Sequence, residues 1–189
     1  CGLVPACRIL DCISVFALTV ADAQAVATIA GGFDAADPYS RENPNSAKVG
    51  MPAKPRLAVP AAPEFFGDAQ NQAVFEQALS QLRELGAELV EIDFAPFREL
   101  AEQLYYGSWV AERTVALERV DPAHINPVVR GIVAGGEQYS ACDAYKAEYI
   151  RAELARKINE ALAGFDALVV PTSPTIRTLA EMAAEPVLF

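Results

Sequence analysis

The chain has 189 residues, of which 52% are hydrophobic and 21% charged, and this composition is typical of a globular protein. Its formal net charge of −10 repels phosphate backbones, so nucleic acid is not an expected partner. The apolar runs are far shorter than the ~20 residues of a membrane-spanning helix, and no basic leader precedes an apolar stretch. We therefore expect a cytoplasmic protein that binds neither nucleic acid nor membrane.

Cysteine and histidine are too sparse to suggest a metal site. The four cysteines are Cys1, Cys7, Cys12 and Cys142, and His124 is the only histidine. Their spacing fits no zinc-binding pattern. We expect free thiols in a reducing compartment rather than a disulfide or a metal site, and no cofactor is predicted.

Both ends of the chain are apolar, since it opens at Cys1 rather than at a methionine and closes at Phe189. Termini normally lie in polar, exposed segments. We therefore expect residues 1–189 to be part of a longer domain that was cut at both ends.

The first predicted element is a helix that begins after Thr19, because Thr19 and Asp22 have the spacing of a capping box. Gly31-Gly32 is expected to end this helix. A long loop rich in Pro, Asn, Asp and Ser, without hydrophobic periodicity, follows over residues 33–55.

A strand, an amphipathic helix and a second strand are predicted next, over residues 56–60, 68–85 and 88–94. This order makes a βαβ unit, so the second strand should lie parallel to the first. The residues expected on the inner side of the helix are Ala69, Ala73, Leu79, Leu82 and Leu85.

Residues 97–120 have a helical pattern that contains Gly107. Glycine costs ~1 kcal/mol relative to alanine inside a helix, so we expect a break at this position. Ser108 is predicted to cap the helix that follows.

Three further elements complete the pattern. A short helix over residues 126–133 is expected to end at Gly135-Gly136, and a long helix covers residues 140–163. The apolar run 166–171 is predicted to be a strand in the interior of a sheet, buried on both faces. Alternating strands and helices place the chain in the α/β class.

The sequence contains no self-contained catalytic site, since nucleophile elbow, P-loop and dinucleotide-binding motifs are all absent. His124 lies in a loop-like stretch and is interpreted as a surface residue rather than a general base. Gly135-Gly136 is interpreted as a helix stop rather than an anion-binding nest. Residues 171–175 could face a ligand at a strand end or form a plain turn, and both interpretations stay open.

Six stretches of the sequence form a further pattern, namely Gly2 to Cys12 with Ser14 to Ala23, Gly32 to Pro38, Glu64 to Asp68, Glu91 to Phe97, Trp109 to Arg113 and Pro171 to Thr175. Together these stretches resemble the amidase-signature family, and the cysteine-containing form of the first resembles its allophanate hydrolases. They occur in the family's order and cover nearly the whole chain. Two positions differ, because Ile9 stands where the family usually has serine and Ser108 where it often has proline.

The resemblance implies a mixed β-sheet sandwiched between helices, of which residues 1–189 would be the middle-to-late portion. It implies that a lysine, acting through a serine on a cis peptide, activates a nucleophilic serine. All three would lie upstream of Cys1, so we expect no catalytic residue in this chain, and Lys48 and Lys54 are expected to be solvated. The implied reaction is hydrolysis of allophanate (urea-1-carboxylate) to ammonia and carbon dioxide in urea or cyanuric acid breakdown. The resemblance is also compatible with a homodimer.

The resemblance further implies two substrate-binding residues, Tyr105 and Arg113. In allophanate hydrolases a tyrosine and an arginine eight positions later contact the substrate, and these two residues match that spacing. From composition alone, a core tyrosine and a surface arginine would be commoner. However, Tyr106, Val110, Arg113 and Leu117 share one largely apolar helical stripe, and a charge that faces a core usually has a partner.

Two other functions stay open at this point. The chain could belong to another amidase-signature enzyme, such as biuret hydrolase or the A-type component of a tRNA amidotransferase. It could also be a complete, non-catalytic α/β binding module. A start codon directly before Cys1 would favour the module, whereas a reading frame that continues upstream into a Gly/Ser-rich stretch would favour an amidase.

Overall fold

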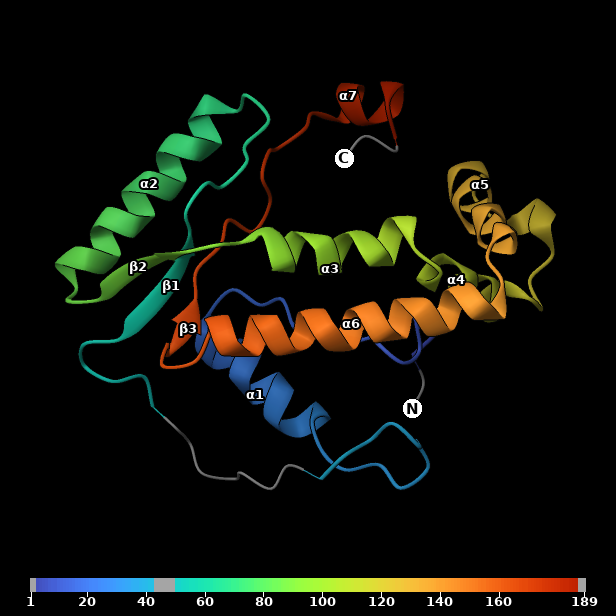
Figure 1. Cartoon of the computed structure of the whole chain (residues 1–189), viewed down its shortest axis with the longest axis horizontal. Helices are drawn as coiled ribbons and strands as arrows, with labels where there is room; N and C mark the ends of the chain where they lie inside the picture. The colour runs from blue at the N-terminus through green and yellow to red at the C-terminus, as the bar shows by residue number, and fades with distance from the viewer. Residues whose placement is uncertain (1–2, 43–49, 187–189) are drawn as a thin grey trace.

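A small parallel sheet lies at one end of the molecule, and helices extend from it (Figure 1). The structure is a computed structural model that describes residues 3–42 and 50–186. Its strands are β1 (Arg56–Pro60), β2 (Glu88–Ile92) and β3 (Ala167–Leu168), in the order β2-β1-β3. Both pairings are parallel, which confirms the α/β class and the expected βαβ unit. No antiparallel pair of the expected mixed sheet occurs among these three strands.

The central strand, β1, is the most buried part of the sheet. Leu57 pairs with Leu89 on one side and with Ala167 on the other. Leu57, Ala58 and Val59 are buried. A strand with neighbours on both edges and apolar residues on both faces is shielded from water in every direction, so β1 positions the rest of the sheet.

The prediction for residues 166–171 was wrong in length and burial. Only Ala167 and Leu168 form a strand, both are half-buried, and Val170 is exposed. β3 has a single neighbour among the described strands, so it lies at the edge. An apolar run indicates a preference for burial, but it does not determine how many strands flank it.

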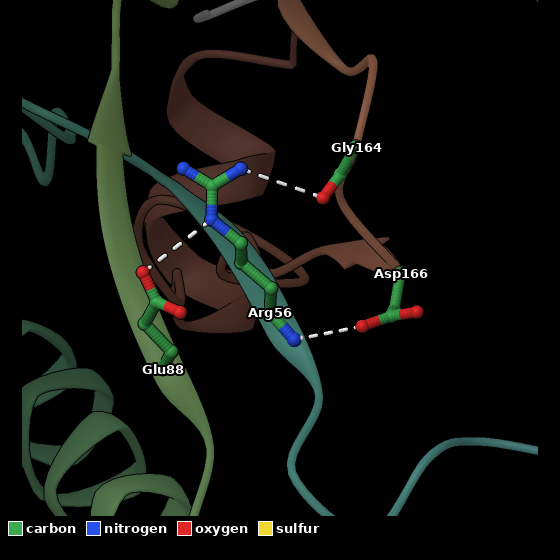
Figure 2. A network of polar contacts seen from close by, with 4 residues as sticks. All are labelled: Arg56, Glu88, Gly164 and Asp166. Atoms are coloured by element: carbon green, nitrogen blue, oxygen red, sulfur yellow. Dashed lines mark hydrogen bonds and ion pairs between the residues drawn. The ribbon is translucent and has the colours of Figure 1, made fainter.

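Arg56 joins the amino ends of all three strands, as Figure 2 shows. Its Nε donates to Glu88 Oε1 at 3.4 Å and its Nη1 donates to the Gly164 carbonyl at 3.4 Å. Its backbone N–H donates to Asp166 Oδ2 at 2.7 Å. The guanidinium carbon also lies 4.4 Å from the ring centre of Phe165, so the arginine is held on several sides by this chain.

Helices α3 (Ala95–Tyr106) and α6 (Ala141–Ala161) lie side by side, and α3 runs away from the sheet while α6 runs back toward it (Figure 1). Shorter helices gather where α3 ends. None of the described helices is long and apolar enough to cross a membrane. The remaining helices are α1 (Val20–Ala30), α2 (Ala69–Glu84), α4 (Trp109–Leu117), η1 (Pro122–His124), α5 (Pro127–Ala134), η2 (Gly135–Gln138) and α7 (Leu179–Ala184).

Most of the predicted helix ends are confirmed. Thr19 accepts from the Asp22 N–H at 3.1 Å and Gly31 follows the last residue of α1. Ser140 and Asp143 form a capping box at the start of α6. The predicted cap at Ser108 was wrong, because its φ of −65° and ψ of −11° are helical and its side chain makes no capping hydrogen bond. An N-cap residue needs an extended backbone to direct its oxygen at the next turn.

The inner side of α2 was predicted only in part. Phe75, which the prediction omitted, is buried against Phe65 with ring centres 5.9 Å apart. The helix packs along β2, at the edge of a narrow sheet, so its contact stripe is narrow. Of the expected residues, Leu79 and Leu82 are half-buried, whereas Ala69, Ala73 and Leu85 are exposed.

Candidate functional site

The corner between α3 and α4 places the two predicted substrate-binding residues. α3 ends at Tyr106 and α4 begins at Trp109, which confirms the break at Gly107. A Cβ at Gly107 would lie 2.5 Å from the Gln103 carbonyl oxygen, so a side chain does not fit this turn. The Tyr139 hydroxyl donates to the Tyr106 carbonyl at 2.7 Å and ties the corner to the segment before α6.

The far wall of the site is formed by η2, which packs directly on α4. Gly136 is buried, and a Cβ there would lie 2.8 Å from the Ala111 Cα and 2.9 Å from Thr114 Oγ1. The Thr114 hydroxyl donates to the Val133 carbonyl at 3.3 Å. Helix α5 ends before Gly135, as expected of a helix stop, but the close packing at Gly136 was not predicted. Nothing local in the sequence signals which helix this glycine touches.

A hollow of about 340 Å³ lies between these elements. Tyr105 and Arg113 both line it, so the structure brings the two predicted residues together. The guanidinium carbon of Arg113 is 5.5 Å from the ring centre of Tyr105, within the range of a cation–π contact. The other lining residues are Tyr106, Val110, Ile132, Gly135, Gln138 and Tyr139.

The break at Gly107 makes the Tyr105–Arg113 pairing possible. On a straight helix, eight residues rotate about 80° beyond two full turns, so Tyr106 would align with Arg113 better than Tyr105 would. Gly107 instead adopts an extended backbone, with φ −109° and ψ −176°, and α4 starts again with its own axis. Both tyrosines therefore reach the hollow.

Arg113 has an incomplete set of partners. Its side chain is half-buried, and its Nε is buried without a hydrogen-bond partner among the described residues. A buried polar group left unsatisfied costs about 1–3 kcal/mol, and more when it is charged. Because the chain as a whole is acidic, this arginine is a local exception that could hold an anion in the hollow.

The other polar residues weighed from the sequence do not join this site. His124 is exposed in η1, as expected of a surface histidine, and Lys54 is exposed as well. Lys48 and Cys1 lie outside the described residues. In the described ranges, no group of three or more His, Cys, Asp or Glu could hold a metal ion. The thiols described are all free, namely Cys7, Cys12 and Cys142.

Residues 171–175 form a turn that is anchored to the start of α2. Asn71 Nδ2 donates to the carbonyls of Ser173 at 2.7 Å and Pro174 at 2.9 Å, and the Thr175 hydroxyl donates to Asp68 at 3.1 Å. The backbone N–H of Asn71, followed by that of Ile176, holds the pKa of Asp68 below its ordinary value. These hydrogen bonds favour the interpretation of residues 171–175 as a plain turn over that of a strand end that faces a ligand.

Comparison with known proteins identifies the family. The chain matches the Amidase family over residues 1–186. It belongs to the amidase family. It is 37% identical to the urea amidolyase of Lachancea kluyveri over 99% of this chain and 10% of that protein. It is 30% identical to an amidase of Pseudomonas putida, over 82% of this chain and 35% of that protein.

Solved structures agree with the sequence comparisons. A Kluyveromyces lactis allophanate hydrolase matches with a TM-score of 0.94 and 38% identity, over 99% of this chain and 32% of that one. The urea amidolyase of the same yeast matches with a TM-score of 0.92 and 38% identity, over 98% of this chain and 12% of that one. The predicted family is thereby confirmed, and the chain spans about a tenth of the urea amidolyase relative's length.

Proposed function

We propose that this amidase-family chain carries the substrate-recognition part of an allophanate hydrolase, in which Arg113 and Tyr105 bind the substrate carboxylate. The observation that carries the proposal is the buried, unpartnered Nε of Arg113 beside the hollow. The 38% identity to a protein described as an allophanate hydrolase supports the choice of substrate.

Allophanate differs from an ordinary amide substrate by the carboxylate next to its amide. A planar guanidinium can hold both oxygens of a carboxylate, and an ammonium cannot do so with the same geometry. The Tyr105 ring, 5.5 Å from the guanidinium carbon, would restrict the orientation of Arg113. A tyrosine hydroxyl can donate a further hydrogen bond to the carboxylate.

The chemical step is proposed to come from residues outside this sequence. The lysine and the two serines that the resemblance implies would lie before Cys1, so the chain by itself is proposed to be inactive. Attack by the nucleophilic serine would expel ammonia and leave an acyl-enzyme; water would then hydrolyse the acyl-enzyme, and the released N-carboxycarbamate would break down to carbon dioxide and a second ammonia. Free thiols at Cys7, Cys12 and Cys142 are consistent with a cytoplasmic enzyme. The homodimer stays a prediction.

The test is Arg113→Ala in the complete natural polypeptide that contains this sequence. Biuret is the matched neutral substrate, because a carboxamide replaces the carboxylate of allophanate. A hydrogen bond to a charged group contributes ~1.5–3 kcal/mol, so kcat/KM for allophanate should fall roughly 10- to 100-fold, with little change for biuret. Arg113→Lys should give an intermediate loss, because it keeps the charge without the planar fork.

Arg119→Ala is the control, since this side chain is 93% exposed and faces solvent just beyond α4. It should leave both substrates unaffected. Equal losses on allophanate and biuret in Arg113→Ala would show that Arg113 is only structural, and no loss on either would overturn the proposal. A wild-type preference for biuret over allophanate would favour the biuret hydrolase alternative.

A further inference from the structure

Residues 6–11 form a turn that is held by hydrogen bonds among its own residues. The N–H groups of Ala6 and Cys7 donate to the Asp11 carboxylate at 2.8 and 3.1 Å. The N–H groups of Leu10 and Asp11 donate back to the Cys7 carbonyl at 2.9 and 2.8 Å. These bonds hold the backbone of residues 6–11 in a closed turn.

This turn is docked on α4 at two points. The buried Cys7 thiol lies 3.9 Å from the Trp109 carbonyl oxygen, and the Ile9 N–H donates to Glu112 Oε1 at 3.1 Å. Glu112 is the residue immediately before Arg113. Neighbouring residues on a helix point about 100° apart, so Glu112 can face the turn while Arg113 faces the hollow.

Only one of the two Glu112 carboxylate oxygens has a hydrogen-bond partner among the described residues. Its Oε1 accepts from Ile9, but its Oε2 is buried and has no hydrogen-bond partner among the described residues. The residue opposite is Ile9. Isoleucine offers a backbone donor at this point and no side-chain donor.

Two carboxylates at helix starts in the described part of the chain each accept two hydrogen bonds from one hydroxyl residue. Asp143 accepts from both the N–H and the hydroxyl of Ser140, at 2.9 and 2.6 Å. Glu181 accepts from both the N–H and the hydroxyl of Thr178, at 2.7 and 2.8 Å. In each case the backbone N–H and the hydroxyl of one residue donate to the same carboxylate oxygen, whereas Ile9 supplies only its backbone N–H.

We infer that Glu112 is a positioning residue that clamps the amino-terminal turn to α4. Ile9 gives this clamp one hydrogen bond, from its backbone, and no side-chain hydrogen bond. A hydroxyl at position 9 would offer this carboxylate a second donor beside the Ile9 N–H. The clamp fixes α4 relative to the turn at residues 6–11, the segment that would follow the upstream serines. It therefore sets the position of Arg113 relative to the reacting amide. This last step rests on the proposed function.

The first experiment tests the clamp without reference to substrate. Threonine and valine have nearly the same shape and differ by the hydroxyl, so Ile9→Thr and Ile9→Val are compared in the complete natural polypeptide. A hydrogen bond to a buried carboxylate should raise the Tm of the unfolding transition that includes this domain in the threonine variant above its value in the valine variant. The difference should vanish when Glu112 is also changed to alanine. No difference, or the same difference without Glu112, would overturn the clamp.

The second experiment tests positioning. Glu112→Ala should raise KM for allophanate about tenfold, with kcat and the biuret reaction nearly unchanged, because it displaces the carboxylate-binding arginine and not the nucleophile. Glu112→Gln keeps an acceptor for the Ile9 N–H and should restore part of the loss. Equal losses on both substrates, or a lower Tm with unchanged KM, would show that Glu112 is only structural.

The two proposals fail in different ways. If Arg113→Ala shows no selective loss on allophanate, the proposed function is wrong and the positioning role of Glu112 falls with it. If Arg113→Ala shows the loss and Glu112→Ala does not, the proposed function stands and the positioning role is wrong. In a double variant with Arg113→Ala, the change at Glu112 should cause no further loss of selectivity.

Discussion

Arg56 and Arg113 lie at opposite ends of the molecule, and this chain supplies more partners to Arg56 than to Arg113. In the sheet, Arg56 contacts Glu88, the Gly164 carbonyl and the Phe165 ring, all from this chain. At the helical end, Arg113 lies near the ring of Tyr105 but keeps a buried Nε without a partner among the described residues. Both arginines are half-buried, so the difference lies in the partners that this chain supplies and not in burial.

The difference in partners separates two roles of a charged residue: a structural charge holds the fold together, and a recognition charge binds a ligand. An arginine that holds strands together gains most when the chain itself supplies its acceptors. An arginine that binds a ligand must keep donors available, and this costs stability in the free protein. Substitutions at the two ends should therefore affect different measurements.

The largest expected effect on stability is at Gly136, in the wall behind Arg113. Gly136→Ala would place a Cβ 2.8 Å from the Ala111 Cα, and overpacking of this kind costs typically ~1–3 kcal/mol. The urea unfolding midpoint should fall, and selectivity for allophanate should fall with it because α4 is displaced. Gly131→Ala is the control, since nothing lies within 4 Å of a Cβ there. It should be neutral or stabilising by up to about 1 kcal/mol, because alanine is the better helix former.

A smaller effect is expected at Arg56. Its side chain is 43% exposed, and exposed ion pairs contribute only about 0–1 kcal/mol. Arg56→Ala should lower the unfolding free energy by roughly 1 kcal/mol and leave the ratio of allophanate to biuret turnover unchanged. A change in that ratio would contradict the division between structural and recognition charges.

The smallest effect is a dependence on pH at Asp68, which joins α2 to the turn at 171–175. Its folded pKa is depressed, first by the Asn71 N–H, so its contribution is present above about pH 4 and is lost as the pH falls through the folded pKa. In Asp68→Asn, which can still cap α2, the decrease of the urea midpoint between about pH 4 and 2 should be shallower. An identical acid profile would mean that the hydrogen bonds to Asp68 do not depend on its charge.

Sequence reasoning succeeded where the signal is local. The cap at Thr19, the start of the long helix near Ser140 and the break at Gly107 each depend on residues within one turn of backbone, so they could be predicted from neighbouring residues. Family resemblance, rather than periodicity, pointed to Tyr105 and Arg113. The structure places the two together, and their binding role stays a prediction.

Features that depend on distant partners could not be predicted. The edge position of β3, the burial of Phe75 and the close approach at Gly136 each depend on which element lies opposite. The unpartnered oxygen of Glu112 is of the same kind, because its neighbour Ile9 is 103 residues away in the chain. Nothing near these residues in the sequence specifies that contact.

The parallel pairing of β1 with β3 has a consequence for synthesis on the ribosome. Arg56 and Asp166, which join the two strands, are 110 residues apart. At about 5–20 residues per second, the last strand emerges roughly 5 to 20 seconds after the first. During that interval one edge of β1 has no partner from β3, and an unpaired apolar strand edge is a template for pairing with other chains. This interval is when a nascent chain of this fold would depend most on a chaperone.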